Sequence, residues 1–149
     1  MKIGEICNRV VVFSTKDMPL SEAGKLMREH HVGCLLVLEE TDRGRIPIGI
    51  VTDRDIVVEV LSAGLDYRTV KVGEIMNADL FVAREDDDIL DALQLMRRRG
   101  VRRLPVILAS GVLVGIVTID DLLGIVAEQL DDLVKAIASE QSREACIRL

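Results

Sequence analysis

Aromatic residues are nearly absent from this sequence: they make up 2% of its 149 residues, and none is Trp. A ligand site built on a Trp platform or anchor is therefore excluded. Apolar residues still account for 49% of the chain, so the core must consist of Val, Ile, Leu and Met. A chain of this length fits one ordinary domain, or two small units that share a core, and can bury roughly 70% of its unfolded surface.

The sequence also lacks the patterns of a disulfide framework or a metal site. Cys7, Cys34 and Cys146 are far apart, no C-x-x-C pair occurs, and the adjacent His30 and His31 have no further histidine or cysteine cluster beside them. We therefore expect reduced thiols and no metal. The N-terminus shows no signal-peptide pattern, and no apolar run is long enough to span a bilayer. These absences predict a cytoplasmic protein that does not contact a membrane.

The charge pattern disfavours two further classes of function. The net charge is −6, which argues against a general nucleic-acid binder. The strongest basic cluster includes residues 97–99, and these arginines lie at the end of an expected helix that begins with the acidic residues 86–88, as the helix dipole favours. A nucleic-acid-binding regulator remains an alternative. No Ser-His-Asp, Cys-His or paired-carboxylate arrangement suited to catalysis emerges, so we do not expect an enzyme.

An internal duplication is the main feature that is present. KIGEICN at residues 2–8 returns as KVGEIMN at 71–77, and GIVTDRDI at 49–56 returns as GIVTIDDL at 115–122. The two spacings are 69 and 66 residues, so a loop in the second copy is three residues shorter. The duplication predicts two similar units related by a pseudo-two-fold axis, with clefts where they meet.

Hydrophobic periodicity predicts the order β-α-β-β-α in each unit. The expected strands are 10–13, 34–38 and 46–51, then 80–83, 103–108 and 112–117, with a charged hairpin loop at 39–45. The expected helices are 20–30, from Thr52 to near Gly64, about 87–99, and a long one from Thr118. We divide the chain into a first unit at 1–69, a second at 70–130, and an extended C-terminal helix and tail at 131–149. One unit alone would be marginal, so we predict an α/β (α+β) fold with the two units packed sheet to sheet.

The last expected helix has a long apolar stripe, made by Leu122, Val126, Leu130, Leu133, Val134 and Ile137. An exposed stripe of this length is a liability, so it should be covered. We expect a homodimer formed through this helix. The alternative is that the helix folds back on its own chain.

In each copy a buried strand ends at Thr, and Asp follows three residues later: Thr52 with Asp55, and Thr118 with Asp121. One interpretation is a capping box, in which the two side chains satisfy backbone N–H groups at a helix start. The other is a nucleotide clamp. A helix N-terminus suits phosphate, a hydroxyl can donate to phosphate or ribose oxygens, and a carboxylate can accept ribose hydroxyls.

The two GIVT motifs, VRRLPV at residues 101–106 and the paired openings together resemble a tandem pair of CBS (cystathionine-β-synthase-type) domains, or Bateman module, over about residues 1–128. The resemblance implies a stand-alone, non-catalytic regulatory module that requires no cofactor. It would bind AMP, ADP, ATP, S-adenosylmethionine or NAD in clefts between the repeats and pass the ligand state to an unknown partner protein. The alternatives are a scaffold with degenerate sites and a misread fragment of inosine monophosphate dehydrogenase, for whose barrel the chain has no room.

By the same resemblance, Asp55 and Asp121 would hold ribose hydroxyls, and Thr52 and Thr118 would contact ribose or phosphate. The segments after the first strand of each repeat would border the base, and basic residues would face the phosphates. The expected site is completed by Ser14, Thr15, Asp17, Ala83, Arg84, Asp86, Arg54, Arg102, Arg103, Pro105 and Asp120.

The two expected sites differ in charge. Arg54 stands inside the first clamp, whereas Asp120 occupies the matching place in the second. The second repeat has Arg102 and Arg103 where the first has Gly33 and Cys34. An arginine can make charge-assisted contacts to phosphate, whereas a carboxylate repels it. We therefore predict that one site binds a phosphorylated nucleotide more tightly, and the sequence leaves open which clamp the arginines serve.

Overall fold

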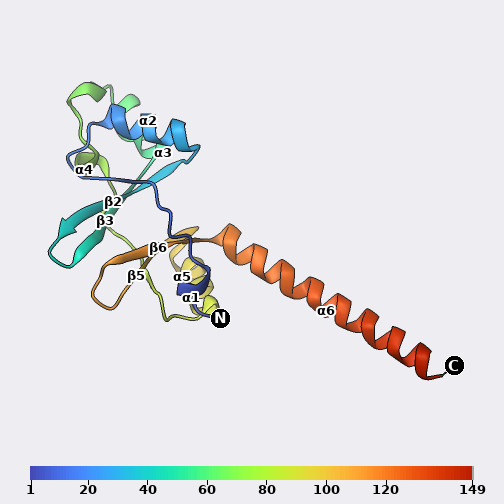
Figure 1. The fold of residues 1–149 in the computed structure, drawn as a ribbon. Helices are drawn as coiled ribbons and strands as arrows, with labels where there is room; N and C mark the ends of the chain where they lie inside the picture. The colour runs from blue at the N-terminus through green and yellow to red at the C-terminus, as the bar shows by residue number, and fades with distance from the viewer. Residues whose placement is uncertain (149) are drawn as a thin grey trace.

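The computed structural model describes residues 1–148 and contains two three-stranded sheets of the same topology. In the first sheet β1 (Phe13–Ser14) is parallel to β2 (Cys34–Thr41), which is antiparallel to β3 (Gly44–Thr52). In the second, β4 (Ala83–Arg84), β5 (Arg103–Ile107) and β6 (Leu113–Thr118) repeat this arrangement. The two sheets form the two lobes of Figure 1, and β3 contacts β6 where the lobes meet. The predicted fold class is confirmed.

Each parallel strand pair needs a crossover, which a helix supplies. In the first lobe this helix is α2 (Leu20–His30), and in the second it is α5 (Ile89–Arg99). Both match the expected ranges closely. Each buries its apolar stripe against its own sheet, and each ends at a left-handed residue, His31 in one lobe and Gly100 in the other.

The first strand of each repeat is shorter and lies later than expected. β1 and β4 have two residues each, and the valines before β1 are outside the ladder, with Val10 82% exposed. A run of β-branched residues indicates a buried strand only where a neighbouring strand is available, and here the run forms a connection between the lobes. The expected loop at 39–45 is also mostly strand. Glu39 pairs with Ile46, and the hairpin turns over two residues between Thr41 and Gly44, whose φ is +131°.

A helical segment follows the last strand of each sheet, as expected. After β3 come α3 (Asp53–Asp55) and the π-helical η1 (Ile56–Leu61), and after β6 comes α6 (Ile119–Ile147). Among residues 1–148, no helix is both long enough and apolar enough to cross a membrane. Residue 149, the last of the expected tail, lies outside the described residues.

Each lobe completes its core with a short helix from the opening of the other repeat. α1 (Ile3–Ile6) binds the second lobe: the Ile3 N–H donates to the Asp87 carbonyl at 2.9 Å, and the Ile3 side chain is fully buried in that core. α4 (Val72–Ile75) binds the first lobe in the same way, with the Val72 N–H donating to the Met18 carbonyl at 3.0 Å. Figure 1 shows α4 in the upper lobe and α1 in the lower one. Each core therefore contains a residue from the opening of the other repeat.

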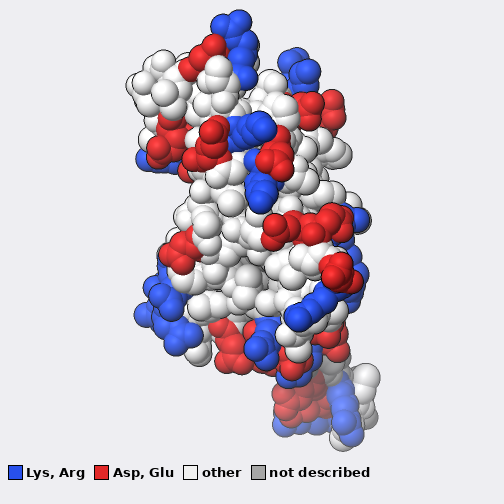
Figure 2. Space-filling view, turned by 90° about the vertical axis from the view of Figure 1, so that its left-hand side faces the viewer, with Lys and Arg blue, Asp and Glu red and all other residues white. Residues whose placement is uncertain are grey.

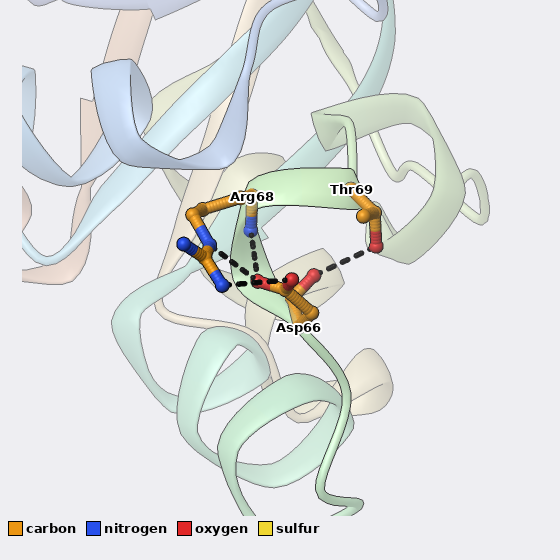
Figure 3. A network of polar contacts seen from close by, with 3 residues as sticks. All are labelled: Asp66, Arg68 and Thr69. Atoms are coloured by element: carbon orange, nitrogen blue, oxygen red, sulfur yellow. Dashed lines mark hydrogen bonds and ion pairs between the residues drawn. The ribbon is translucent and has the colours of Figure 1, made fainter.

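The connection between the repeats is fixed by a polar turn around η2 (Tyr67–Thr69), shown in Figure 3. Asp66 Oδ1 accepts hydrogen bonds from the Arg68 backbone N–H at 3.1 Å and from Arg68 Nε at 3.0 Å. Thr69 Oγ1 donates to the Asp66 carbonyl at 2.8 Å. The bond from the Arg68 guanidinium holds the pKa of Asp66 below its ordinary value. This turn directs the chain toward α4.

Helix α6 leaves the body and extends far beyond it (Figure 1). Leu122 is buried against the second core, but Leu130 is 58% exposed and Ile137 59%. The helix therefore does not fold back on its own chain, and the alternative of an intrachain cover is wrong. Its apolar stripe is open to a partner.

Candidate functional site

Two of the clefts between the lobes include the start of a helix that follows β3 or β6, whereas a third, of about 300 Å³, is lined by residues such as Phe13, Arg45 and Val112 and includes no helix start. The large cleft has a volume of about 730 Å³. It combines the start of α3 in the first repeat with two parts of the second repeat: the linker before β4 and the loop between α5 and β5. Its lining consists of Gly33, Ile50, Thr52, Asp53, Arg54, Asn77, Asp79, Leu80, Phe81, Arg99, Gly100, Val101, Arg102, Arg103 and Pro105.

The small cleft has a volume of about 280 Å³ and uses the equivalent segments with the repeats exchanged. It combines the start of α6 with the linker before β1 and the loop between α2 and β2. Its lining consists of Asn8, Val10, Val11, Val12, Val32, Gly33, Cys34, Leu36, Arg103, Ile116 and Thr118. The expected pseudo-symmetric pair of clefts is therefore present, and each draws on both repeats.

Backbone bridges hold the linker of one repeat against the last strand, β3 or β6, of the other. Ile50 and Asn77 exchange N–H···O bonds of 3.0 and 2.8 Å, and Ile116 and Asn8 exchange bonds of 2.9 and 2.8 Å. The close contact between the linker and β6 at the Ile116–Asn8 bridge requires glycine at position 115, because a Cβ there would lie 2.5 Å from the Asn8 carbonyl oxygen. The bridges fix the position of both linkers and thereby the shape of both clefts.

Both Thr-x-x-Asp motifs form capping boxes. Thr52 Oγ1 accepts from the Asp55 N–H at 3.1 Å, and Asp55 Oδ2 accepts from the Thr52 N–H at 2.9 Å. Thr118 and Asp121 repeat this geometry at 3.2 and 2.9 Å. Thr52 and Thr118 each line a cleft, whereas neither described lining includes the two aspartates. The capping interpretation is therefore correct, and a ribose contact by these aspartates stays a prediction.

The arginines gather on one cleft. Arg54, Arg99, Arg102 and Arg103 all line the large cleft, whereas Arg103 is the one arginine among the described lining residues of the small cleft. The arginines of the second repeat therefore lie chiefly in the same cleft as Thr52 of the first repeat. Arg102 Nη2 also lies 3.8 Å from Asp120 Oδ1 in an exposed ion pair.

The sequence interpretation missed several lining residues, mainly in the linkers before the first strands. Phe81 has the Arg99 guanidinium 4.7 Å from its ring centroid, so the two form a cation–π wall of the large cleft. The charge pattern places Arg99 at the helix end and does not indicate its contact with Phe81. The 69-residue offset was the available signal: Asn77 to Phe81 match Asn8 to Val12, and both sets follow a repeated opening.

The residues expected to border the base lie elsewhere. Ser14 and Ala83 are buried, and Ser14 Oγ donates to the Thr15 carbonyl at 2.9 Å. Thr15, Asp17, Arg84 and Asp86 are exposed, and Asp17 lines a separate surface depression with Lys71 and Glu74. None of these six appears in either described lining, because β1 and β4 lie later than expected and the linkers take the cleft positions.

The two half-buried cysteines, Cys7 and Cys34, were considered as nucleophiles. Burial raises the pKa of the Cys7 thiol, which disfavours a thiolate nucleophile. Cys34 lies in the small cleft, whose other lining residues include no acid or histidine. Within residues 1–148, no group of three or more His, Cys, Asp or Glu is placed to hold a metal ion.

The family model of the CBS domain matches residues 3–62 and again residues 72–128. This chain belongs to the CBS domain family. Hypoxic response protein 1 of Mycobacterium tuberculosis is 37% identical over 136 residues, which cover 91% of this chain and 92% of that protein. An uncharacterized protein of Methanopyrus kandleri is 36% identical over 83% of this chain, and the match spans only 61% of that relative.

Solved structures of CBS proteins have the same fold. Hypoxic Response Protein I, solved with two coordinated zinc ions, has a TM-score of 0.71 at 36% identity, covering 83% of this chain and 97% of that one. A CBS domain protein from Pyrobaculum aerophilum complexed with AMP also has a TM-score of 0.71, covering 82% of this chain and 90% of that one. At 24% identity, the second likeness concerns the fold alone.

Proposed function

We propose that this CBS pair is a non-catalytic regulatory module that binds an adenine nucleotide in the large cleft. The observation that carries the proposal is the clustering of Arg54, Arg99, Arg102 and Arg103 in one cleft of about 730 Å³, beside the helix start at Thr52. A cleft of this size is in the range of small-molecule sites. Several guanidinium groups and a helix N-terminus are suited to phosphate. The adenine ligand class comes from the resemblance to CBS domains; the Pyrobaculum aerophilum protein, which has the same fold, was solved with AMP.

The large cleft has both apolar and charged lining residues, which suit different parts of a nucleotide. Ile50, Leu80 and Pro105 supply apolar groups in the lining, against which we expect a purine to pack. The arginines and the Thr52 hydroxyl face the phosphate side. Asp53 and Asp79 also line the cleft and oppose excess negative charge, so the balance of charges favours a phosphorylated nucleoside over inorganic polyphosphate.

We further propose that the protein acts in the cytoplasm as a homodimer formed through α6. The helix presents an apolar stripe that includes Leu130, Leu133 and Ile137, each more than half exposed. A second copy covers such a stripe symmetrically. Ligand binding then shifts the population of one packing of lobes and subunits, and a partner protein recognises the surface that this packing presents. The same stripe supports the second candidate function, a dimerising scaffold that binds no nucleotide.

A nucleic-acid role has less support. The face in Figure 2 carries lysine and arginine interspersed with acidic residues, around an area that is mainly uncharged. Nonspecific nucleic-acid binding depends on a continuous basic surface that displaces counterions. The cleft arginines are opposed by Asp53 and Asp79, which lowers the local potential further.

Calorimetric titration with AMP, ADP, ATP, S-adenosylmethionine, NAD and GTP tests the proposal. We expect at least one adenosyl ligand to bind, and Arg102→Ala to weaken the phosphorylated ligands while leaving the unfolding temperature of the free protein unchanged. Arg97→Ala is the matched control, because Arg97 is exposed on α5 and outside both described linings. Asp55→Ala and Asp121→Ala test the ribose contacts. Binding of no ligand by a folded wild-type dimer would favour the scaffold.

A further inference from the structure

One arginine belongs to both clefts. Arg103, the first residue of β5, lines the large cleft and the small cleft, and it pairs in register with Thr118, the helix cap of the small cleft. Arg103 is half-buried, so it is neither a core residue nor a fully exposed one. Gly33 is likewise common to both linings. The two clefts are therefore close enough to share a charged group.

The small cleft depends on this arginine more than the large cleft does. Among its described lining residues Arg103 is the one charged side chain, and the others are mainly aliphatic, from Val10 to Ile116. The large cleft has three further arginines. An anionic group in the small cleft thus has one guanidinium to bind, whereas an anionic group in the large cleft has four.

We propose that Arg103 couples the two clefts, so that a phosphorylated ligand in the large cleft weakens the binding of a phosphorylated ligand in the small cleft. The inference rests on the proposed nucleotide site and adds the regulation of that site. With the large cleft filled, the small cleft becomes a nearly uncharged apolar site. It then takes a phosphate-free nucleoside rather than a nucleotide.

The sign of the coupling follows from charge. A guanidinium that already binds one phosphate offers less positive potential to a second phosphate, and two phosphates near one cation repel each other. The Arg102–Asp120 pair acts in the same direction. If Arg102 turns toward a phosphate in the large cleft, Asp120 is left unpaired next to Thr118 at the small cleft. That pair is exposed and its atoms are 3.8 Å apart, so its effect is the lesser one.

The test separates coupling from an intrinsic difference between the clefts. Leu80 and Val11 occupy equivalent linker positions, one lining the large cleft and the other lining the small cleft. Leu80→Trp blocks the large cleft and gives the intrinsic AMP affinity of the small one, and Val11→Trp does the reverse. Titration of the wild type then gives the small-cleft affinity when the large cleft is filled. Circular dichroism checks each fold, and Leu80→Phe and Val11→Phe replace a variant that does not fold.

We expect filling of the large cleft with AMP to weaken AMP binding in the small cleft by about fivefold or more. The coupling is measured by the ratio of the small-cleft dissociation constant in the wild type to that in Leu80→Trp. With adenosine as the second ligand, this ratio should stay near one. The same ratio is measured in Arg103→Gln, alone and combined with each blocking variant, and for AMP it should fall to near one. Arg103→Lys should retain part of the ratio, and the control Arg97→Gln should leave it unchanged.

Three results would overturn the coupling. They are a wild-type AMP ratio near one, a ratio that persists in Arg103→Gln, and a folded Leu80→Trp variant that binds neither AMP nor adenosine. In each case AMP binding by Val11→Trp shows that the proposed function still holds. Loss of all nucleotide binding in Val11→Trp and in the wild type would instead reject the proposed function itself, and the coupling with it.

Discussion

The two repeats agree in their interiors and differ in their clefts. Leu35 and Leu104 occupy equivalent buried positions, and Gly49 and Gly115 lie at equivalent bridges between the lobes. Where the second strand of each repeat begins, however, Gly33 and Cys34 are replaced by Arg102 and Arg103. The architecture therefore depends on what the copies share, whereas the proposed nucleotide binding depends on residues that they do not share.

The largest expected effect tests whether the two interiors are equivalent. Leu35→Ala and Leu104→Ala each remove a fully buried side chain, and we expect each to lower the free energy of unfolding by about 2–5 kcal/mol. Because Ile3 completes the second core and Val72 the first, both variants should unfold in one transition in urea. Two separate transitions would show that the lobes fold independently despite the exchange.

The glycines at the bridges should differ in their tolerance of a side chain. A Cβ on Gly49 would lie 2.6 Å from Met76 Sδ, the end of a flexible side chain, whereas a Cβ on Gly115 would meet the Asn8 carbonyl oxygen. We expect Gly115→Ala to cost about 1–3 kcal/mol of unfolding free energy and Gly49→Ala less. Urea unfolding of both variants measures the difference. Equal costs would mean that the linker at Asn8 moves as easily as the Met76 side chain.

The sequence was sufficient for the repeated elements and insufficient for their exchange. Hydrophobic periodicity located α2 and α5 because each buries one face locally, and the repeated motifs located both helix caps. Ile3 packs in the core of the second lobe, far away in the sequence, and a local sequence pattern does not indicate such a long-range contact. The cleft linings were partly missed for the same reason. Phe81 and Arg99 belong to different elements, and only the fold brings them together.

Substitution of Arg54 or of its counterpart Asp120 should have a smaller effect, and this effect is on nucleotide affinity. Arg54 lines the large cleft, and Asp120 occupies the equivalent position in the second repeat. We expect Arg54→Ala to weaken AMP binding in the large cleft by about 1 kcal/mol, because an exposed charge contributes modestly. Asp120→Ala should leave the large cleft unchanged or strengthen binding in the small one. Calorimetric titration measures both, and a loss of affinity in Asp120→Ala would contradict the charge comparison.

The smallest expected effect concerns how the two crossover helices begin. Asp88 caps α5 by accepting from the Leu90 N–H at 3.0 Å, whereas Pro19 at the start of α2 has no side-chain hydrogen bond. That bond, with the N-terminal ammonium 3.6 Å away, holds the pKa of Asp88 below its ordinary value. A carboxyl group whose pKa is lower in the folded state stabilises that state fully at a pH above its pKa in the unfolded chain, about 4. The stabilisation is lost as the pH falls through its pKa in the folded protein.

Asp88→Ala should therefore lower the unfolding temperature at pH 7, and the difference from wild type should disappear toward pH 2. Pro19→Ala is the matched control, because any effect it has should not depend on pH in this range. Thermal unfolding followed by circular dichroism across the pH series measures both variants. A deficit in Asp88→Ala that stays constant down to pH 2 would mean that the carboxylate charge does not stabilise α5. The acid sensitivity of the two repeats would then not differ at this position.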